Sequence, residues 1–173
     1  MAAPDPDCRI EPLAPHHDRA GFTCGIDSLD RYFRTQASQD MRRKANAVFV
    51  LVAPDSPAEV RGYYTLCATG VSQGAVPPAA RKHIPRYPLV SATLVGRLAV
   101  SQARQGEGLG SLLLADAVRR AYASAASVGS SMLVVDAISE RAAAFYEGHG
   151  FVLLPESLRL VLPMATLGGL LQS

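Results

Sequence analysis

A run of alternating glycines is the part of this 173-residue chain with the clearest chemical meaning. Residues 105–111 read Q-G-E-G-L-G-S and lie between an apolar stretch, residues 93–100, and an amphipathic one, residues 108–126. The first stretch is typical of a buried strand and the second of a helix. Backbone N–H groups in such a loop, together with the positive end of the helix dipole, bind phosphate, and glycines let it approach closely. The segment therefore predicts a diphosphate site.

Two other kinds of phosphate loop do not fit this segment. A Walker loop needs Lys and then Ser or Thr after its last glycine, and a Rossmann fingerprint needs glycine at the position of Ser111. A plain tight turn between strand and helix explains one or two glycines. Three alternating ones, Gly106, Gly108 and Gly110, favour the phosphate site.

The elements around the loop predict a mixed α/β fold with a central sheet. Asp27 or Ser28 caps a helix that runs to about Arg43. The residues that repeat at four-residue spacing on its buried stripe are Leu29, Phe33, Ala37 and Met41. Further elements are expected as a hairpin at 47–53 and 62–71, a proline-rich connection at 72–91 with one short helical turn, a strand at 93–100, a helix at 108–126, a strand at 132–137, a helix from Ser139 through Tyr146, and strands at 151–154 and 159–162.

Length and composition fit one domain over residues 1–173, with 49% hydrophobic and 18% charged residues. No apolar run approaches the roughly 20 residues that span a bilayer, and the first residues do not resemble a secretory signal. We therefore expect a cytoplasmic protein without a membrane partner. The three cysteines lack a C-x-x-C pair and the four histidines lack ligand spacing, so no metal is expected.

The glycine segment resembles the acetyl-CoA signature of the Gcn5-related N-acetyltransferase (GNAT) superfamily, Q/R-x-x-G-x-G/A. Gln105, Gly108 and Gly110 match it, directly after the strand R-L-A-V. The resemblance implies a GNAT fold, in which a central, mostly antiparallel sheet splays between two central strands, here 93–100 and 132–137, with helices on both faces. It also implies acetyl-CoA as co-substrate, held by Leu98, Ala99, Val100, Gln105, Gly106, Glu107, Gly108, Leu109, Gly110, Ser111 and Phe145.

A narrower resemblance covers nearly the whole chain. The motifs are F-x-C-G-x-x-x-L-D at 22–30, G-Y-Y-T-L at 62–66, R-K-H-I-P at 81–85, G-R-L-A-V at 96–100 and F-Y-E-G-H-G-F at 145–151. In this order they are similar to the acetyltransferase toxins of bacterial toxin-antitoxin modules. That resemblance implies acetylation of the α-amino group of aminoacyl-tRNA, which stops translation. It also implies a ribbon-helix-helix antitoxin as partner, and a homodimer.

Acetyl transfer from a thioester to an amine needs an oxyanion donor and an acid near the departing sulfur. Tyr146 is the candidate acid, because a phenol has a reference pKa near 10, close to that of an alkyl thiol. The resemblance places the tyrosine of F-Y-x-x-x-G-F at this position. In the alternative interpretation, Phe145 and Tyr146 are core aromatics of a short helix, although helix neighbours point about 100° apart and seldom share an environment.

The sequence has no obvious general base near these motifs. An α-amino group, with a pKa near 7.7–8.0, is already partly neutral at pH 7, whereas the lysine amine near 10.4 is not. An aminoacyl ester is therefore the better chemical fit, with a water-mediated carboxylate such as Asp136 left open.

The net charge of +2 does not by itself indicate a nucleic-acid binder. The basic residues are nevertheless clustered, and clusters of this kind contact phosphates. They also fit ordinary solvated surface. As tRNA contacts we expect Arg42, Arg43, Lys44, Arg81, Lys82, Arg86 and Arg97.

Two alternatives to a tRNA-acetylating toxin stay open at this point. One is an acetyltransferase for a small-molecule or protein amine, and the other is a non-catalytic acyl-CoA-sensing or partner-binding module. Tyr146 counts against the second. The amino acid and tRNA selected and the identity of the antitoxin do not follow from the sequence.

Overall fold

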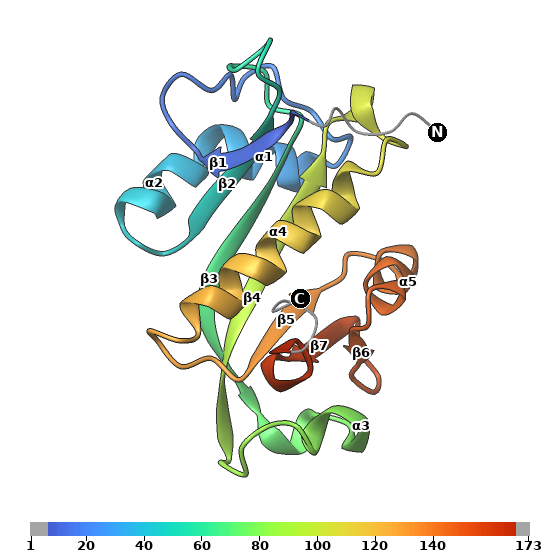
Figure 1. Cartoon of the computed structure of the whole chain (residues 1–173). Helices are drawn as coiled ribbons and strands as arrows, with labels where there is room; N and C mark the ends of the chain where they lie inside the picture. Colours follow the sequence, from blue (N-terminus) through green and yellow to red (C-terminus); the bar gives the residue numbers. More distant parts are fainter. Residues whose placement is uncertain (1–6, 169–173) are drawn as a thin grey trace. The chain divides into compact units, whose positions relative to one another are not determined.

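The computed structural model describes residues 7–168, which form a mixed α/β fold (Figure 1). Seven strands hydrogen bond in the order β1-β2-β3-β4-β5-β7-β6. Strands β4 and β5 pair in parallel, whereas β1 with β2, β2 with β3, β5 with β7 and β6 with β7 pair antiparallel. The predicted mixed and mostly antiparallel sheet is therefore confirmed.

The strands are β1 (Arg9–Pro12), β2 (Ala47–Val52), β3 (Gly62–Ser72), β4 (Leu89–Val100), β5 (Met132–Asp136), β6 (Val152–Leu153) and β7 (Arg159–Pro163). The α-helices are α1 (Asp27–Thr35), α2 (Ala37–Arg42), α3 (Pro78–Arg81), α4 (Leu109–Ser124) and α5 (Glu140–Gly148). Short 3-10 helices are η1 (Gln73–Ala75), η2 (Gln102–Arg104) and η3 (Met164–Thr166). No helix among residues 7–168 is both long enough and apolar enough to cross a bilayer.

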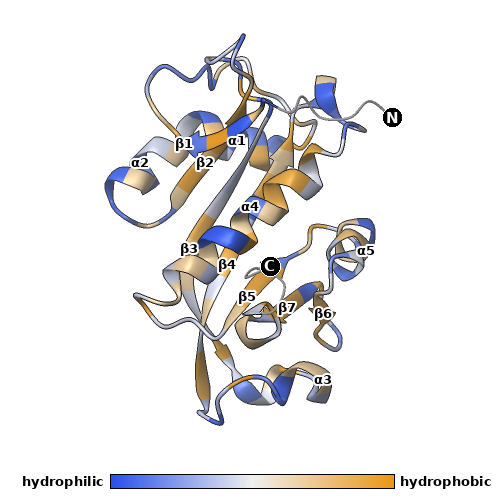
Figure 2. Cartoon of the chain, viewed as in Figure 1, coloured by the Kyte–Doolittle hydropathy of each residue, from blue (hydrophilic) through white to orange (hydrophobic). Residues whose placement is uncertain are grey.

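The chain forms two compact units, and the long elements β3, β4 and α4 contribute to both. The first unit contains the residues up to Cys67 together with Arg97–Ala117. The second unit contains Ala68–Gly96 and the residues from Val118 on. Each unit has a hydrophobic core of its own. Figure 2 shows hydrophobic residues concentrated along strands such as β2 and β5, as expected for strands that cross a core.

Aromatic rings organise the core of the first unit. The rings of Phe22, Phe33 and Tyr63 lie with centroids 4.5–5.5 Å apart, and the Tyr63 hydroxyl donates to the Leu29 carbonyl at 2.7 Å. Leu113 of helix α4 is fully buried beside Gly62 of β3. A Cβ at Gly62 of β3 would lie 2.7 Å from Leu113 and 2.9 Å from a backbone oxygen, so only glycine fits at this crossing.

The core of the second unit lies between its strands and α3. Val90 and Ala92 of β4, Met132 and Val134 of β5 and Val161 of β7 are all buried together with apolar residues of the 71–84 segment. The parallel pairing of β4 with β5 runs from Ala92↔Met132 to Val95↔Val135. Beyond the last of these pairs, β4 continues to Val100.

The single helix predicted to run to Arg43 is wrong, because the chain forms α1 and α2 with a break at Gln36. Gln36 has φ −120° and ψ −29°, outside the helical well. Just before the break the Thr35 hydroxyl bonds back to the Arg31 carbonyl at 2.7 Å, a contact that bends helices. The Gln36 side chain in turn donates to Asp40 at 3.0 Å. The predicted buried stripe survives the break, with Leu29, Phe33 and Ala37 buried and Met41 packed against them.

Two strand boundaries also differ from the expectation. Strand β1 was not predicted, because its sequence R-I-E-P has no apolar run, and it pairs with one neighbour, β2. Strand β4 begins at Leu89 inside the expected connection 72–91, which also contains η1 and α3. Leu89 is exposed, so the alternation that marks a strand is weak at its start.

Candidate functional site

The glycine loop, residues 105–111, belongs to the first unit and ends in α4. Gly106 and Gly108 have φ values of +86° and +78°, which side-chain-bearing residues rarely adopt. A Cβ on either glycine would meet nothing within 4 Å, so open space lies where a ligand would approach. The first amides of a helix have no acceptor within the helix, and α4 begins directly after Gly108 at the buried Leu109. This arrangement fits a diphosphate at the helix N-terminus.

Gln105, the first residue of the signature, anchors the loop by its side chain. Its Nε2 donates to the Cys24 carbonyl at 3.0 Å and to the Val100 carbonyl at 3.3 Å. The Gln102 amide adds a bond to the Thr23 carbonyl at 2.8 Å. The loop is therefore tied at its start both to the end of β4 and to the turn at Thr23–Cys24. The sequence-based interpretation, in which Gln105 serves the cofactor directly, did not foresee this supporting role.

Asp30 holds the other side of that turn. Its carboxylate accepts from the Cys24 amide at 2.8 Å and from the Thr23 hydroxyl at 2.9 Å, and the residue is 4% exposed. Burial alone would raise the pKa of Asp30, but the hydrogen bonds from Cys24 and Thr23 outweigh it and lower the pKa. Burial also raises the pKa of the Cys24 thiol to about 11, so this cysteine stays protonated. The motif at 22–30 thus builds a hydrogen-bonded support for the glycine loop.

The other residues expected to hold acetyl-CoA flank this support. Ala99 is buried in the core of the first unit, and its neighbours Leu98 and Val100, half-buried, point to the opposite face because side chains alternate along a strand. Glu107 is half-buried, Gly110 lies in the first turn of α4 and Ser111 is exposed. The first unit therefore contains every predicted cofactor contact except Phe145.

Tyr146 and Phe145 lie on α5 in the second unit. Ser139 caps this helix by accepting from the Ala142 amide at 3.1 Å, as the sequence predicts. Tyr146 is 8% exposed and packs edge-on against Phe151, with centroids 5.7 Å apart. Phe145 is half-buried and contacts the Tyr146 ring edge-on.

Burial raises the pKa of Tyr146 to about 12. Burial therefore makes the Tyr146 phenol a weaker acid in the free protein than its reference pKa near 10 implies, and moves that pKa away from the expected balance with a thiol. The phenol holds its proton over the whole physiological range. In this environment Tyr146 can donate a hydrogen bond and does not act as a base.

Asp136, left open as a water-mediated base, is paired in the structure. The Arg159 guanidinium donates to its two carboxylate oxygens at 2.7 and 2.9 Å. This pair raises the pKa of Arg159. A carboxylate whose two oxygens both accept from a guanidinium is poorly disposed to take a proton from water, which disfavours Asp136 as the base.

The basic residues Arg81, Lys82 and Arg86, which form the second basic cluster, line a cavity of about 490 Å³ in the second unit, which we call the basic cavity. Lys82 and Arg86 line it with exposed side chains. Arg81 also lines it, but its Nε donates to the Val76 carbonyl at 2.9 Å and its Nη2 to the Gly74 carbonyl at 3.3 Å. Arg81 thus fastens α3 to the preceding turn, and Lys82 and Arg86 are the exposed cations that line the basic cavity.

The first basic cluster, Arg42, Arg43 and Lys44, is exposed at the end of α2 in the first unit. Arg97, on the first unit's part of β4, lies over the Tyr32 ring with its guanidinium carbon 3.5 Å from the centroid. The Tyr32 hydroxyl donates to Asp40 of α2 at 2.8 Å. The structure thereby links Arg97 to the helix that carries the first cluster.

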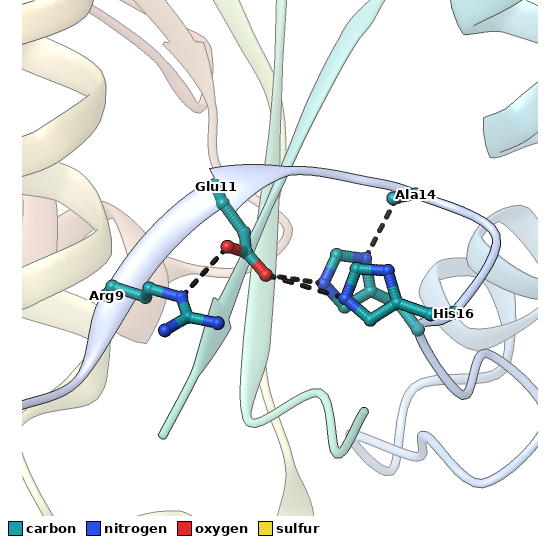
Figure 3. Close-up of polar contacts among 5 residues, drawn as sticks. Arg9, Glu11, Ala14 and His16 are labelled. Carbon is teal, nitrogen blue, oxygen red and sulfur yellow. Dashed lines mark hydrogen bonds and ion pairs between the residues drawn. The ribbon is translucent and has the colours of Figure 1, made fainter. Parts of the chain in front are cut away.

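Glu11, His16 and His17 form the one group of potential metal ligands found among residues 7–168, with ligand atoms within 4.8 Å of one another (Figure 3). The His17 Nδ1 accepts from the Ala14 amide at 2.9 Å, so the ring proton sits on Nε2, which donates to Glu11 at 2.8 Å. That bond, with help from Arg9, lowers the pKa of Glu11. A cation here would need the lone pair where the Nε2 proton lies. The group closes the turn after β1, and the absence of a metal stays a prediction.

Comparison with known proteins identifies the family. Residues 46–153 match the acetyltransferase (GNAT) domain family. A tRNA-acetylating toxin of Mycobacterium tuberculosis is 34% identical over 85% of this chain and 86% of its own length. A probable toxin TacT of Sinorhizobium fredii is 29% identical over 94% of both chains.

A solved structure of AtaT complexed with acetyl-methionyl-tRNAfMet superposes with a TM-score of 0.87 at 30% identity, covering 96% of this chain and 100% of that one. A tyrosine-to-phenylalanine mutant of KacT gives the same TM-score and identity, with 95% and 99% covered. The glycine loop at the head of α4, the mixed sheet and the family match agree, and the chain belongs to the GNAT acetyltransferases.

Proposed function

We propose that this N-acetyltransferase is a toxin that transfers the acetyl group of acetyl-CoA to the α-amino group of aminoacyl-tRNA and thereby blocks translation. The family match supports the reaction class, and the tRNA-acetylating relatives support the acceptor. The observation that carries the choice of acceptor is the basic cavity, where Lys82 and Arg86 present exposed cations to one hollow surface. A small-molecule amine would not need phosphate contacts of this kind.

The hydrogen bonds and the burial described above support the following division of labour. The amides of the glycine loop and α4 hold the diphosphate, and Gln105 and Asp30 keep that loop in place. Acetyl-CoA supplies the activated acetyl thioester. Tyr146 carries a proton on its phenol at every physiological pH and donates it to the departing sulfur. The acceptor amine, with a pKa near 7.7–8.0, reaches its neutral form without a protein base.

The partners follow by the same resemblance. Relatives have been solved with the C-terminus of the antitoxin AtaR and as a KacTA-DNA complex. We infer that this chain is neutralised by an antitoxin, of the ribbon-helix-helix type, and that it acts as a cytoplasmic homodimer. Growth arrest on expression, relieved by the product of a neighbouring small reading frame, is the corresponding test.

The decisive experiment is acetyl transfer from labelled acetyl-CoA to aminoacyl-tRNA, compared with the same tRNA after deacylation and with the free amino acid. We expect label on the aminoacyl ester alone. Transfer to free amino acids or to lysine peptides at an equal rate would instead make the chain an acetyltransferase of another amine. Binding of acetyl-CoA without any transfer would point to a sensing module.

The basic cavity is tested with single-charge variants. Lys82→Ala and Arg86→Ala are each expected to weaken tRNA binding and to reduce the slope of log affinity against log salt by about 1, because each phosphate contact releases a counterion. Arg31→Ala is the matched control, since it removes one exposed charge from α1, away from both clusters in sequence. Salt slopes equal to that of Arg31→Ala would assign Lys82 and Arg86 to ordinary surface.

A further inference from the structure

The second unit contains a larger cavity, of about 700 Å³, that the residues considered so far leave without a role. Val71 and Ala75, from the end of β3 and from η1, line this cavity. Ala137, after β5, and Leu158, in the β6–β7 turn, line it as well. Ligand pockets of roughly 300–1,000 Å³ take molecules the size of a nucleoside with a substituent. The volume therefore exceeds what a lone amino-acid side chain needs.

The lining of this cavity is mostly apolar with a single charged pair among its described residues. Asp136 and Arg159 both line the cavity and neutralise each other through two hydrogen bonds. A guanidinium has five N–H donors, and this pair uses two, so three can meet oxygen atoms of a ligand. Such a cavity suits a ligand with hydroxyl or ester oxygens and an apolar body. It offers no uncompensated charge to an acidic or basic side chain.

The η1 segment contributes to the walls of both the larger cavity and the basic cavity. Gln73 of η1 lines the basic cavity, while its neighbours Gly74 and Ala75 line the larger one. Arg81 holds this segment in place through its bonds to the Gly74 and Val76 carbonyls. A chain whose phosphates occupy the basic cavity can therefore place its next groups in the larger one.

Residues that line this cavity are close in sequence to Tyr146, the proposed acid. The backbone leaves the cavity wall at Ala137, forms α5 with Tyr146, and returns to the wall at Leu154. The Ala137 amide donates to the Leu158 carbonyl at 2.8 Å, which fixes the base of this excursion. Helix α5 also contacts both β6 and β7, which flank the turn at Leu158.

We propose that the larger cavity receives the aminoacyl-adenosine end of the acceptor RNA, with the amino-acid side chain against Val71, Ala75 and Leu158. The preferred acceptors are then tRNAs charged with apolar amino acids, because the charged residues of the cavity lining, Asp136 and Arg159, pair with each other. This inference rests on the proposed function and narrows it to a substrate class.

The test is a substitution that fills the larger cavity. Ala75→Phe adds a ring at an exposed position of the wall, whereas Ala79→Phe adds the same ring at an exposed position of α3 that does not line the cavity. Wild type and both variants are assayed with tRNAs charged with glycine, valine, methionine, aspartate and lysine. Wild type should favour valine and methionine. Ala75→Phe should raise KM for these two by roughly tenfold or more and for glycine much less, as expected for pocket contacts, and Ala79→Phe should match wild type.

Two further measurements distinguish an unfolded variant from a wrong assignment of the cavity. Acetyl-CoA affinity of Ala75→Phe by calorimetry reports whether the variant is folded, and Leu158→Ala supplies a second change that removes a wall contact. If wild type prefers aspartate or lysine, or if Ala75→Phe and Leu158→Ala both keep the wild-type ranking, the cavity assignment is overturned. If wild type acetylates none of the charged tRNAs, the proposed function itself fails.

Discussion

Replacing Asp30 tests whether the Thr23–Cys24 turn supports the glycine loop. Asp30→Asn keeps the shape of the side chain but replaces one carboxylate oxygen with an NH₂ group. That NH₂ group faces either the Cys24 amide or the Thr23 hydroxyl, both of which donate to the carboxylate in the wild type. Hydrogen bonds to charged groups contribute about 1.5–3 kcal/mol, so the loss of one should lower the free energy of unfolding by about that amount. Acid should remove the same contribution from wild type. The folded pKa is depressed, so the stabilisation is present above pH about 4 and is lost as the pH falls further.

The functional consequence reaches acetyl-CoA through Gln105. If the Cys24 carbonyl shifts, the Gln105 amide loses a neutral hydrogen bond worth about 0.5–1.5 kcal/mol, which converts to a roughly 2- to 12-fold increase in the Kd of acetyl-CoA. Calorimetry measures this Kd and thermal unfolding measures stability. Asp27→Asn, an exposed carboxylate on the same helix, is the matched control. A destabilised Asp30→Asn protein with the Kd of Asp27→Asn would refute the coupling between turn and loop.

Three further predictions concern the chemistry. Gly110→Glu should abolish acetyl-CoA binding, because it places a negative side chain at the phosphate end of α4, whereas Gly129→Glu in an open surface turn should bind normally in calorimetry. Tyr146→Phe should keep its affinity for acetyl-CoA and tRNA but lose roughly 10²- to 10⁴-fold in single-turnover transfer; a loss within about threefold would return Tyr146 to a packing role. The rate should rise with pH to about 8 as the acceptor amine loses its proton and then stay level to about pH 10, since the pKa of Tyr146 is about 12; a descent centred near 10 in rapid-quench assays would contradict that pKa.

Periodicity and glycine spacing predicted most of the elements that place the site. The hairpin, the long helix after the loop and the Ser139 cap all follow from local patterns, and the structure confirms them. The break at Gln36 and strand β1 did not follow. The break at Gln36 depends on side-chain hydrogen bonds within its own segment, from Thr35 to Arg31 and from Gln36 to Asp40, which apolar periodicity does not reveal, and β1 depends on its pairing with β2.

The functional site likewise has features that follow from residue type alone and features that depend on the fold. The three glycines and the phenol are visible in the sequence because their chemistry is intrinsic to the residue types. The role of Gln105 is not visible, since it arises from carbonyls at Cys24 and Val100, the first of which lies 81 residues away. The raised pKa of Tyr146 likewise comes from burial that folding creates.

Arg81 and Arg97 already make contacts within the protein, and this affects how each would act on the rate constants of tRNA binding. Arg81 donates hydrogen bonds to backbone carbonyls and the Arg97 guanidinium lies over the Tyr32 ring, yet each arginine keeps its full positive charge. Long-range attraction of a polyanion depends on that charge, whereas residence time depends on contacts made after arrival. Arg81 and Arg97 should therefore act mainly on the association rate constant of tRNA, while Lys82 and Arg86 act on both rate constants.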